Sequence, residues 1–104
     1  MRVRLYKKTK DNLSYFQILT DDGQAVLNSQ GYADKDDRNN GVRSVVANAN
    51  NPVRYERQTS ADGKNFFIIK AGNGQEIARS VDFDDAASME AAITASMAEI
   101  PSLT

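Results

Sequence analysis

The sequence predicts an α+β fold built from two tandem repeats, each made of three strands followed by one helix. Three observations support this prediction. The chain repeats itself at an offset of 51 residues, runs of aromatic and β-branched residues alternate with turn dipeptides, and apolar residues then recur at helical spacing. We therefore expect one domain, residues 1–104, with repeat one at 1–51 and repeat two at 52–104.

The repeat can be followed residue by residue. The segment YFQILTDDGQAVLNS of repeat one corresponds to FFIIKAGNGQEIARS of repeat two. Identical pairs include Asp11 and Asp62, Phe16 and Phe67, Ile18 and Ile69, Gly23 and Gly74, Ser29 and Ser80, and Asp34 and Asp85. Upstream, a one-residue gap places Val53 opposite Val3. A unit of about 50 residues buries too little surface to be stable alone, so we expect the repeats to share one core, as a monomer or a weak homodimer.

The strands come first in each repeat. The runs RVRLYKK and VRYERQ predict first strands at 2–8 and 53–58, each followed by a turn and a second, aromatic-rich strand. The turn signals are Asp11-Asn12, Asp22-Gly23, Asp62-Gly63 and Asn73-Gly74. Asp-Gly and Asn-Gly accept positive φ and predict type I′ turns into short third strands around Val26 and Ile77. Each repeat should form a three-stranded meander.

A helix follows each meander, and Asp34 and Asp85 are suitable N-caps for the two helices. Apolar residues at helical spacing are Val42, Val45, Val46 and Ala49 in repeat one, and Met89, Ile93, Met97 and Ile100 in repeat two. Asn50, Asn51 and Pro52 end the first helix and lead directly into repeat two. The second helix is followed by only Pro-Ser-Leu-Thr, so we expect the sheet to have one unfilled edge.

The composition restricts the chemistry. The chain has no Cys and no His, which excludes thiol catalysis and removes the commonest general base and metal ligand. We expect no enzyme, no cofactor and no metal site. A net charge of -1 and a pI near 5.3 provide no overall field for nucleic acid or anionic membranes. No signal-peptide segment and no 18-residue apolar run are found, so we expect a cytoplasmic protein.

Two local features have a structural and a functional interpretation. The acidic segment DKDDRNNG suggests a calcium loop, but counting from Asp36 its third position is Arg38 and its twelfth is Ala47, so helix capping by Asp34 and Asp37 is favoured. Gly41 lies inside the first predicted helix, where glycine costs about 1 kcal/mol relative to alanine. Close packing of helix on sheet is the favoured reason, and exposed backbone offered to a ligand is the alternative.

Several short motifs together resemble the YegP-like domain family. These are Gly23-Gln24, Ser29, Gly31-Tyr32, Asn40-Gly41-Val42 with Ser44-Val45, and Ala71 with Gly72-Asn73-Gly74-Gln75. The resemblance covers almost the whole chain and implies an α+β fold whose two repeats complete one antiparallel sheet by exchanging strands. It implies no reaction. Repeat two carries Ala91-Ala92 in place of Asn40-Gly41, so any site built around that pair would exist only once.

Strand alternation divides the sheet residues between two faces. Phe16, Ile18, Phe67 and Ile69 should face the helices. The residues expected to join them are Val3, Leu5, Val26, Val53, Tyr55 and Ile77. The residues expected on the opposite face are Arg4, Tyr6, Lys8, Tyr15, Gln17, Leu19, Leu27, Arg54, Phe66, Ile68 and Lys70. If both helices cover one face, large apolar groups would lie in water on the other, unless loops, a terminus or cross-strand pairing covers them.

Two functions are consistent with this second face. The favoured one is a non-enzymatic interaction module that binds an unknown protein partner or a second copy through the apolar groups Tyr15, Leu19, Leu27, Phe66 and Ile68. The alternative is single-stranded nucleic-acid binding, in which Tyr6, Tyr15 and Phe66 stack on bases. The cations that would meet phosphates are Arg2, Arg4, Lys7, Lys8, Lys10, Arg54 and Arg57. The acidic pI counts against this alternative.

Overall fold

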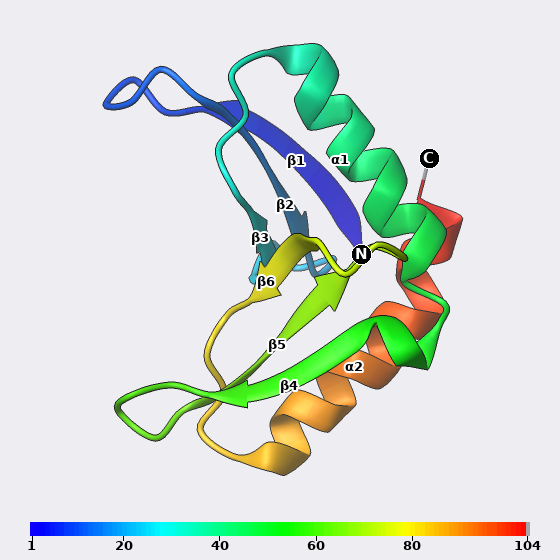
Figure 1. Ribbon diagram of the computed structural model, residues 1–104. Coiled ribbons are helices and arrows are strands. Elements are labelled where there is room, and N and C mark those ends of the chain that lie inside the picture. Colours follow the sequence, from blue (N-terminus) through cyan, green and yellow to red (C-terminus); the bar gives the residue numbers. More distant parts are fainter. Residues whose placement is uncertain (104) are drawn as a thin grey trace.

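The computed structural model describes residues 1–103 and shows the predicted α+β architecture, with two helices packed on one face of a six-stranded antiparallel sheet (Figure 1). Repeat one contributes β1 (Arg2–Lys7), β2 (Ser14–Leu19), β3 (Ala25–Ser29) and α1 (Lys35–Asn48). Repeat two contributes β4 (Tyr55–Thr59), β5 (Asn65–Lys70), β6 (Glu76–Ser80) and α2 (Ala86–Glu99). Two short 3-10 helices, Pro52–Arg54 and Ile100–Ser102, follow α1 and α2.

The sheet order is β1-β2-β3-β6-β5-β4, so the two meanders meet at the centre of the sheet. The junction is the antiparallel pair β3 and β6, in which Leu27, Asn28 and Ser29 lie opposite Ser80, Arg79 and Ala78. Each repeat keeps its own three strands together, so within residues 1–103 no strand is exchanged and the repeats join in one sheet through this central pair. Within residues 1–103, β1 and β4 are equivalent open edges, one in each repeat, so the sheet has two unfilled edges where one was predicted.

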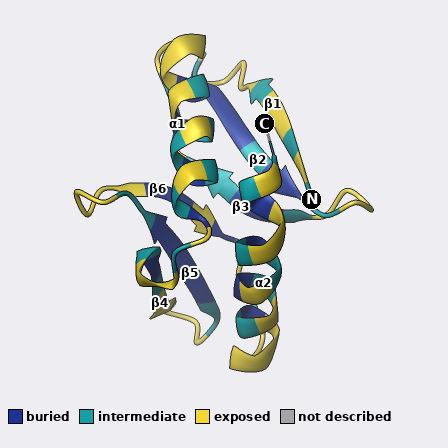
Figure 2. Cartoon of the chain, turned by 90° about the vertical axis from the view of Figure 1, so that its right-hand side faces the viewer, coloured by how far each residue is buried: buried dark blue, intermediate teal, exposed yellow. Residues whose placement is uncertain are grey.

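The core lies between the sheet and the helices, as the alternation predicted. Phe16, Ile18, Phe67 and Ile69 are fully buried. Figure 2 shows β2 and β5 buried along most of their length, whereas the outer sides of the helices are exposed. Helix α1 contacts β2 of its own repeat and also β5 and β6 of the other. The Tyr55 hydroxyl donates a 2.7 Å hydrogen bond to the Ala49 carbonyl, which ties repeat two to the end of α1. The shared core is therefore built from both repeats.

The prediction that Val53 lies in a core-facing strand is wrong. Val53 belongs to the 3-10 helix Pro52–Arg54, where Pro52 occupies the first turn, and it is 79% exposed. Tyr55 lies opposite Ile69 as Val3 lies opposite Ile18, so Tyr55 is the true counterpart of Val3. Leu5 has the predicted direction, opposite Phe16, but it lies on the sheet edge and is 50% exposed.

The hairpin turns occur where they were predicted, but they are not type I′. That turn requires positive φ at both central residues. In the β2–β3 turn only Gly23 has positive φ, at 92°, and in the β5–β6 turn only Gly74, at 84°. A single positive-φ glycine at the end of the turn is typical of a three-residue loop. A separate register shift opposite Ile18/Leu19 and Ile69/Lys70 leaves Val26 and Ile77 as the extra, bulged residues of β3 and β6.

Both predicted N-caps are confirmed. The Asp34 carboxylate accepts a hydrogen bond from the Asp37 backbone N–H, and the Asp85 carboxylate accepts one from Ser88. Asp37 lies in the first turn of α1, where its negative charge favours the helix dipole. Neither α1 nor α2 has the length and apolar composition that a transmembrane helix needs.

Candidate functional site

The sheet face turned away from α1 and α2 is the candidate surface, and we call it the open face (Figure 1). Cross-strand register defines a central row on it, from β1 to β4: Arg4, Gln17, Asn28, Arg79, Ile68 and Glu56. A second row in repeat one pairs Tyr6 with Tyr15, and the corresponding row in repeat two pairs Gln58 with Phe66. The register therefore brings together most of the predicted face residues.

The apolar residues of this face are not left in water. Tyr15, Leu19, Phe66 and Ile68 are each at most 9% exposed. Cations lie over the rings of Tyr15 and Phe66, and Gly31 in the loop after β3 lies against Leu13 and the Tyr15 ring, so both neighbouring side chains and a loop cover this face, as the alternative predicted. Among residues 1–103 the expected exposed apolar patch is therefore absent from the open face.

Three cations lie over aromatic rings on the open face. The Arg4 guanidinium lies 4.7 Å from the centroid of Tyr6, the Lys8 ammonium 4.3 Å from that of Tyr15, and the Arg79 guanidinium 4.8 Å from that of Phe66. The rings of Tyr6 and Tyr15 also stack on each other, with centroids 5.4 Å apart. These contacts hold the charges in place above the aromatic layer.

Two predicted face residues lie elsewhere. Leu27 is opposite Ile18 and belongs to the core cluster on the helix side, because the bulge after the β2–β3 turn shifts the alternation of β3. Arg54 lies in the 3-10 helix after α1, and its guanidinium donates a 3.1 Å hydrogen bond to the Asn48 side chain. Neither residue contributes to the open face.

The two halves of the open face differ in charge. In repeat two, Lys70 pairs with Glu56 at 2.9 Å, and Arg79 lies 3.9 Å from Glu76. The hydrogen bond from Lys70 lowers the pKa of Glu56, with a smaller effect from Gln58. In repeat one, none of Arg2, Arg4 and Lys8 forms an ion pair within residues 1–103. The repeat-one half is therefore the cationic half.

Tyr15 is fixed from both ends of its ring. Its hydroxyl donates a hydrogen bond to the Asp11 carboxylate, which raises the pKa of Tyr15 and lowers that of Asp11. The backbone N–H of Leu13 bonds the same carboxylate at 3.0 Å. The β1–β2 loop thus holds the stacked rings of Tyr6 and Tyr15 in place. Because Tyr15 is only 9% exposed, it supports the structure of the open face and has little surface that a partner could contact.

Sequence reasoning missed two face residues, Asn28 and Arg79. Asn28 accepts a 2.8 Å hydrogen bond from the Gln17 side-chain amide, and Gln17 accepts one of 2.8 Å from Arg4. The signal that could have found them is the repeat itself, since Asn28 and Arg79 are equivalent positions in the third strands. Counting alternation through the bulges at Val26 and Ile77 obscured that signal.

Gly41 shows the close packing that the sequence favoured. A Cβ atom at this position would lie 2.5 Å from the hydroxyl oxygen of Tyr32 and 3.2 Å from a ring carbon of Phe16. The rings of Phe16 and Tyr32 stack with centroids 6.5 Å apart. Glycine is therefore required for Tyr32 to lie against α1.

The comparisons with known proteins agree on one group. The model of a family described as a domain of unknown function, DUF1508, matches residues 10–56 and 60–101, one match per repeat. The UPF0339 protein in the ptx operon 5′ region of Stutzerimonas stutzeri is 42% identical over 78 residues, which cover 75% of this chain and 70% of that protein. The UPF0339 protein YegP of Escherichia coli strain K12 is 35% identical over 86 residues, covering 83% and 78%.

Solved structures support the same grouping. The solution NMR structure of the E. coli protein of unknown function YegP superposes with a TM-score of 0.90 and 33% identity, covering 99% of this chain and 88% of that one. The UPF0339 protein of Shewanella oneidensis superposes with a TM-score of 0.89 and 25% identity. The fold is thus the same along nearly the whole chain.

Proposed function

The chain belongs to the DUF1508 family of UPF0339 proteins, and from that premise we propose that it is a non-enzymatic binding module that holds an acidic protein segment on its open face. The observation that carries the proposal is the cationic half of that face, where Arg2, Arg4 and Lys8 form no ion pair within residues 1–103. A carboxylate-bearing partner would supply the missing counter-charges.

The arrangement of these cations supports binding. Arg4 is held over Tyr6 and Lys8 over Tyr15, so a partner that meets them orders fewer flexible side chains than it would on an ordinary surface. An apolar partner is less well matched, because Leu19 and Ile68 are almost fully covered. The favoured partner is therefore acidic.

The edge strand β1 gives this partner a place to bind. The outer backbone groups of β1 have no neighbouring strand, and a segment that pairs with them alternates its side chains between the two faces of the sheet. On the open side such a segment would meet Arg2 and Arg4. On the other side it would meet Leu5, which is 50% exposed beside a groove of about 360 Å³ that reaches Val42 of α1.

The opposite edge is less suitable. Arg57 of β4 is the counterpart of Leu5, and it forms an ion pair with Glu90 of α2 through two hydrogen bonds, the longer of 2.8 Å. This pair spans the gap between strand and helix that is open in repeat one. The proposal therefore assigns the partner to β1 and not to β4.

The test is a fluorescence anisotropy titration with a labelled peptide in which Glu alternates with Val, and with a matched peptide in which Lys replaces Glu. We expect the acidic peptide to bind the wild-type protein and the Arg2→Gln/Arg4→Gln variant to bind it at least about fivefold more weakly. The control variant Lys7→Gln/Lys35→Gln removes the same charge, because Lys7 points to the other face of β1. Equal weakening by both variants, or equal binding of both peptides, would refute the proposal.

Single-stranded nucleic acid is the second candidate, and the observation that favours it is the stack of Tyr6 on Tyr15 with one cation over each ring. Three of the cations named for it lie off the open face, since Lys7 points to the other face of β1, Arg54 bonds Asn48 and Arg57 bonds Glu90. A labelled oligothymidine in the same titration decides between the two. Tighter binding of the oligonucleotide than of the acidic peptide, with a steep loss between low and moderate salt, would favour nucleic acid.

The oligomeric state and the cellular location are also part of the proposal. We propose that the protein is a monomer, because two cationic halves would repel each other on contact. We also propose that it acts in the cytoplasm. Light scattering after size exclusion measures the mass, and fractionation of source cells measures the location. A stable dimer broken by Arg4→Gln would instead assign the open face to self-association.

A further inference from the structure

The groove beside Leu5 lies on the helix side of the β1 edge, on the opposite face of the sheet from the open face. The residues that line it are Val3, Leu5, Asn39, Val42 and Arg43, and its volume is about 360 Å³. Three of these five residues are apolar, and half of the Leu5 surface is exposed. The groove therefore presents an apolar surface directly beside an open strand edge.

The second repeat shows that the fold can close this groove by itself. Arg57 of β4 has the same register as Leu5 of β1, and Glu90 of α2 is equivalent to Asn39 of α1. Arg57 and Glu90 form an ion pair across the gap between strand and helix. The same gap in repeat one holds Leu5 and Asn39, which cannot form an ion pair, so an apolar side chain is exposed there in place of a charged bridge.

The backbone of β1 shows which of its residues a partner strand would bond. The N–H of Lys8, the residue after β1, donates a 3.0 Å hydrogen bond to the Leu13 carbonyl, so it points toward the chain that enters β2. Successive residues of an antiparallel strand direct their backbone groups to opposite sides. The N–H and carbonyl groups of Lys7, Leu5 and Val3 therefore point outward from the sheet.

The hydrogen bonds of β2 agree with this assignment. Ser14, which lies opposite Lys7, bonds Tyr32 through both its N–H and its carbonyl, each at 2.8 Å. The N–H of Phe16, which lies opposite Leu5, bonds a side chain of β3 at 2.9 Å. Both residues thus direct these groups away from β1. Leu5 combines outward backbone groups with a side chain beside the groove.

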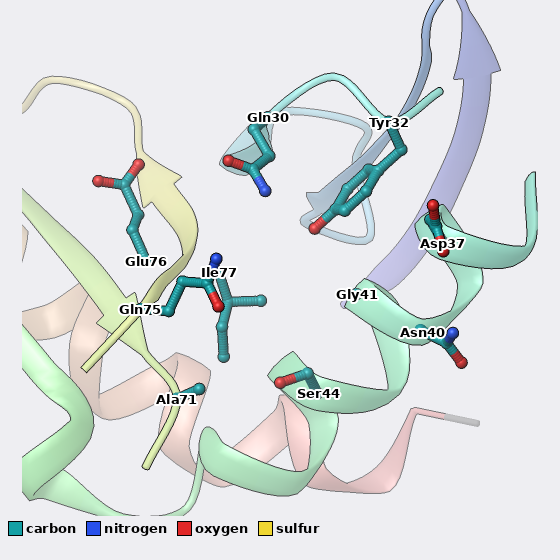
Figure 3. A pocket seen from close by; sticks show the side chains of 10 residues that line it. All are labelled: Gln30, Tyr32, Asp37, Asn40, Gly41, Ser44, Ala71, Gln75, Glu76 and Ile77. Carbon is teal, nitrogen blue, oxygen red and sulfur yellow. The ribbon is translucent and has the colours of Figure 1, made fainter. Parts of the chain in front are cut away.

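The polar groove on the other flank of α1 has no such edge beside it. Figure 3 shows this groove between Tyr32 and the turn that joins β5 to β6, with the Glu76 carboxylate and the Asn40 side chain turned away from it. Asn40 instead accepts a hydrogen bond from Arg43. A segment that pairs with β1 would reach the groove beside Leu5 and not this one.

We infer that the partner segment pairs with β1 as an added strand and places a large apolar side chain, such as leucine, in the groove beside Leu5. Only an extended chain can bond the outward backbone groups of Leu5 and fill the groove at the same time. The partner residue opposite Leu5 has its side chain on the same face of the sheet as Leu5, so it packs against Val3 and Val42.

The neighbours of this apolar residue lie on the open face. Arg4, which precedes Leu5 and points to that face, matches an acidic side chain there. The partner motif is therefore an acidic residue, a large apolar residue and a second acidic residue. The inference rests on the proposed function for the two acidic residues and adds the apolar residue between them.

The test is an anisotropy titration of the full chain with three labelled peptides. The first alternates Glu with Ser and has Leu at its central Ser position, the second has Ser at that position, and the third keeps Leu and has Gln in place of each Glu. We expect the first peptide to bind about tenfold more tightly than the second, because only leucine buries apolar surface in the groove.

The three peptides separate this inference from the proposed function. Equal binding of the first and second peptides would overturn the apolar residue and leave the acidic partner standing. Equal binding of the first and third, with weaker binding of the second, would overturn the acidic partner and leave the apolar residue standing. Absence of binding by all three would overturn both.

A double variant closes the groove without a change in net charge. Leu5→Arg/Asn39→Glu installs the ion pair of repeat two, so it should bind the first and second peptides with equal affinity. The mirror variant Arg57→Leu/Glu90→Asn makes the reverse exchange at the far edge and should leave the tenfold ratio unchanged. A tenfold ratio that persists in folded Leu5→Arg/Asn39→Glu protein would refute the assignment to this groove.

Amide hydrogen exchange of the wild type locates the added strand without any substitution. With the first peptide at saturation, we expect exchange at Val3 and Leu5 to slow by at least about tenfold, because their outward N–H groups become bonded. Exchange at Arg4 and Tyr6 should change little, since their N–H groups already point to β2. Binding that leaves the Leu5 amide unprotected would overturn the pairing with β1.

Discussion

At the scale of single residues, Gly41 and Tyr32 form a packing pair that repeat two replaces with Ala92 and Phe83. The Tyr32 hydroxyl occupies the space where a Cβ of residue 41 would lie. In repeat two the hydroxyl is absent, because Phe83 replaces tyrosine, and a methyl group is present, because Ala92 replaces glycine. The two positions are therefore coupled through one contact.

Gly41→Ala should lower the free energy of unfolding by about 1 to 2 kcal/mol, because the overpacking of Tyr32 exceeds the gain in helix propensity. Adding Tyr32→Phe should restore most of the loss, since it reproduces the pair of repeat two. Urea denaturation of the wild type, both single variants and the double variant measures the coupling. Additive effects of the two substitutions would show that the contact is not the cause.

The sequence predicted the reason for Gly41 but not its partner. A glycine within a helical pattern indicates that something approaches closely. That the approaching group is Tyr32 depends on the path of 30–34 between β3 and α1, which is a tertiary feature. The spacing of residues within one segment does not predict which residues of another segment they contact.

At the scale of elements, the strands, turns and helices were predicted in the right order, and the errors come from backbone irregularities. Asp-Gly and Asn-Gly are compatible with a type I′ turn and with a three-residue loop that ends in a positive-φ glycine, and neither signal predicts the bulge at Val26 that reverses the alternation at Leu27. Pro52 similarly starts a 3-10 helix in place of a strand and moves Val53 into solvent. Strand alternation therefore assigns residues to the correct face of the sheet only in stretches that contain no bulge and no 3-10 helix.

The cap of α2 predicts a pH effect. The hydrogen bond from Ser88 lowers the pKa of Asp85 from its ordinary value of 3.8, so the folded state keeps this carboxylate ionised to lower pH than the unfolded state does. Its contribution to stability is complete above the unfolded pKa and is lost as pH falls through the lower folded pKa.

Asp85→Asn should therefore leave stability at neutral pH nearly unchanged, because Asn is also a good N-cap, and should reduce the loss of stability in acid. Urea midpoints for wild type and variant, measured at neutral pH and again below pH about 4, provide the comparison. If the midpoints of the two proteins fall in parallel, the Asp85 carboxylate does not contribute to acid sensitivity.

At the scale of the whole molecule, the two repeats are expected to depend on each other. Helix α1 packs on β5 and β6, and Tyr55 bonds the end of α1. A fragment containing 1–51 would expose the apolar groups that repeat two covers. We expect it to be unfolded or dimeric by circular dichroism and light scattering, and to gain structure when 52–104 is added. A folded, monomeric fragment would contradict the shared core.

The sequence predicted more of the fold than of the candidate surface, because each structural assignment could be checked in both repeats. Phe16 and Phe67 occupy matching positions, and both are fully buried. The open face offers no such agreement, since Arg4 in repeat one corresponds to Glu56 in repeat two. Whether Leu19 and Ile68 are covered depends on long side chains whose positions follow from the twist of the sheet. Those positions cannot be predicted from the sequence alone.

The central pair of strands has a mechanical consequence. The β1 and β2 strands are joined over six opposed residue pairs, whereas β3 is joined to β2 and to β6 over three each, and β6 is joined to β5 over three. The centre of the sheet therefore has the shortest strand pairing, and α1 packs across it, because this helix contacts β2 of repeat one and β5 and β6 of repeat two. Loosening α1 would leave the centre of the sheet without that support, so the two meanders could twist against each other.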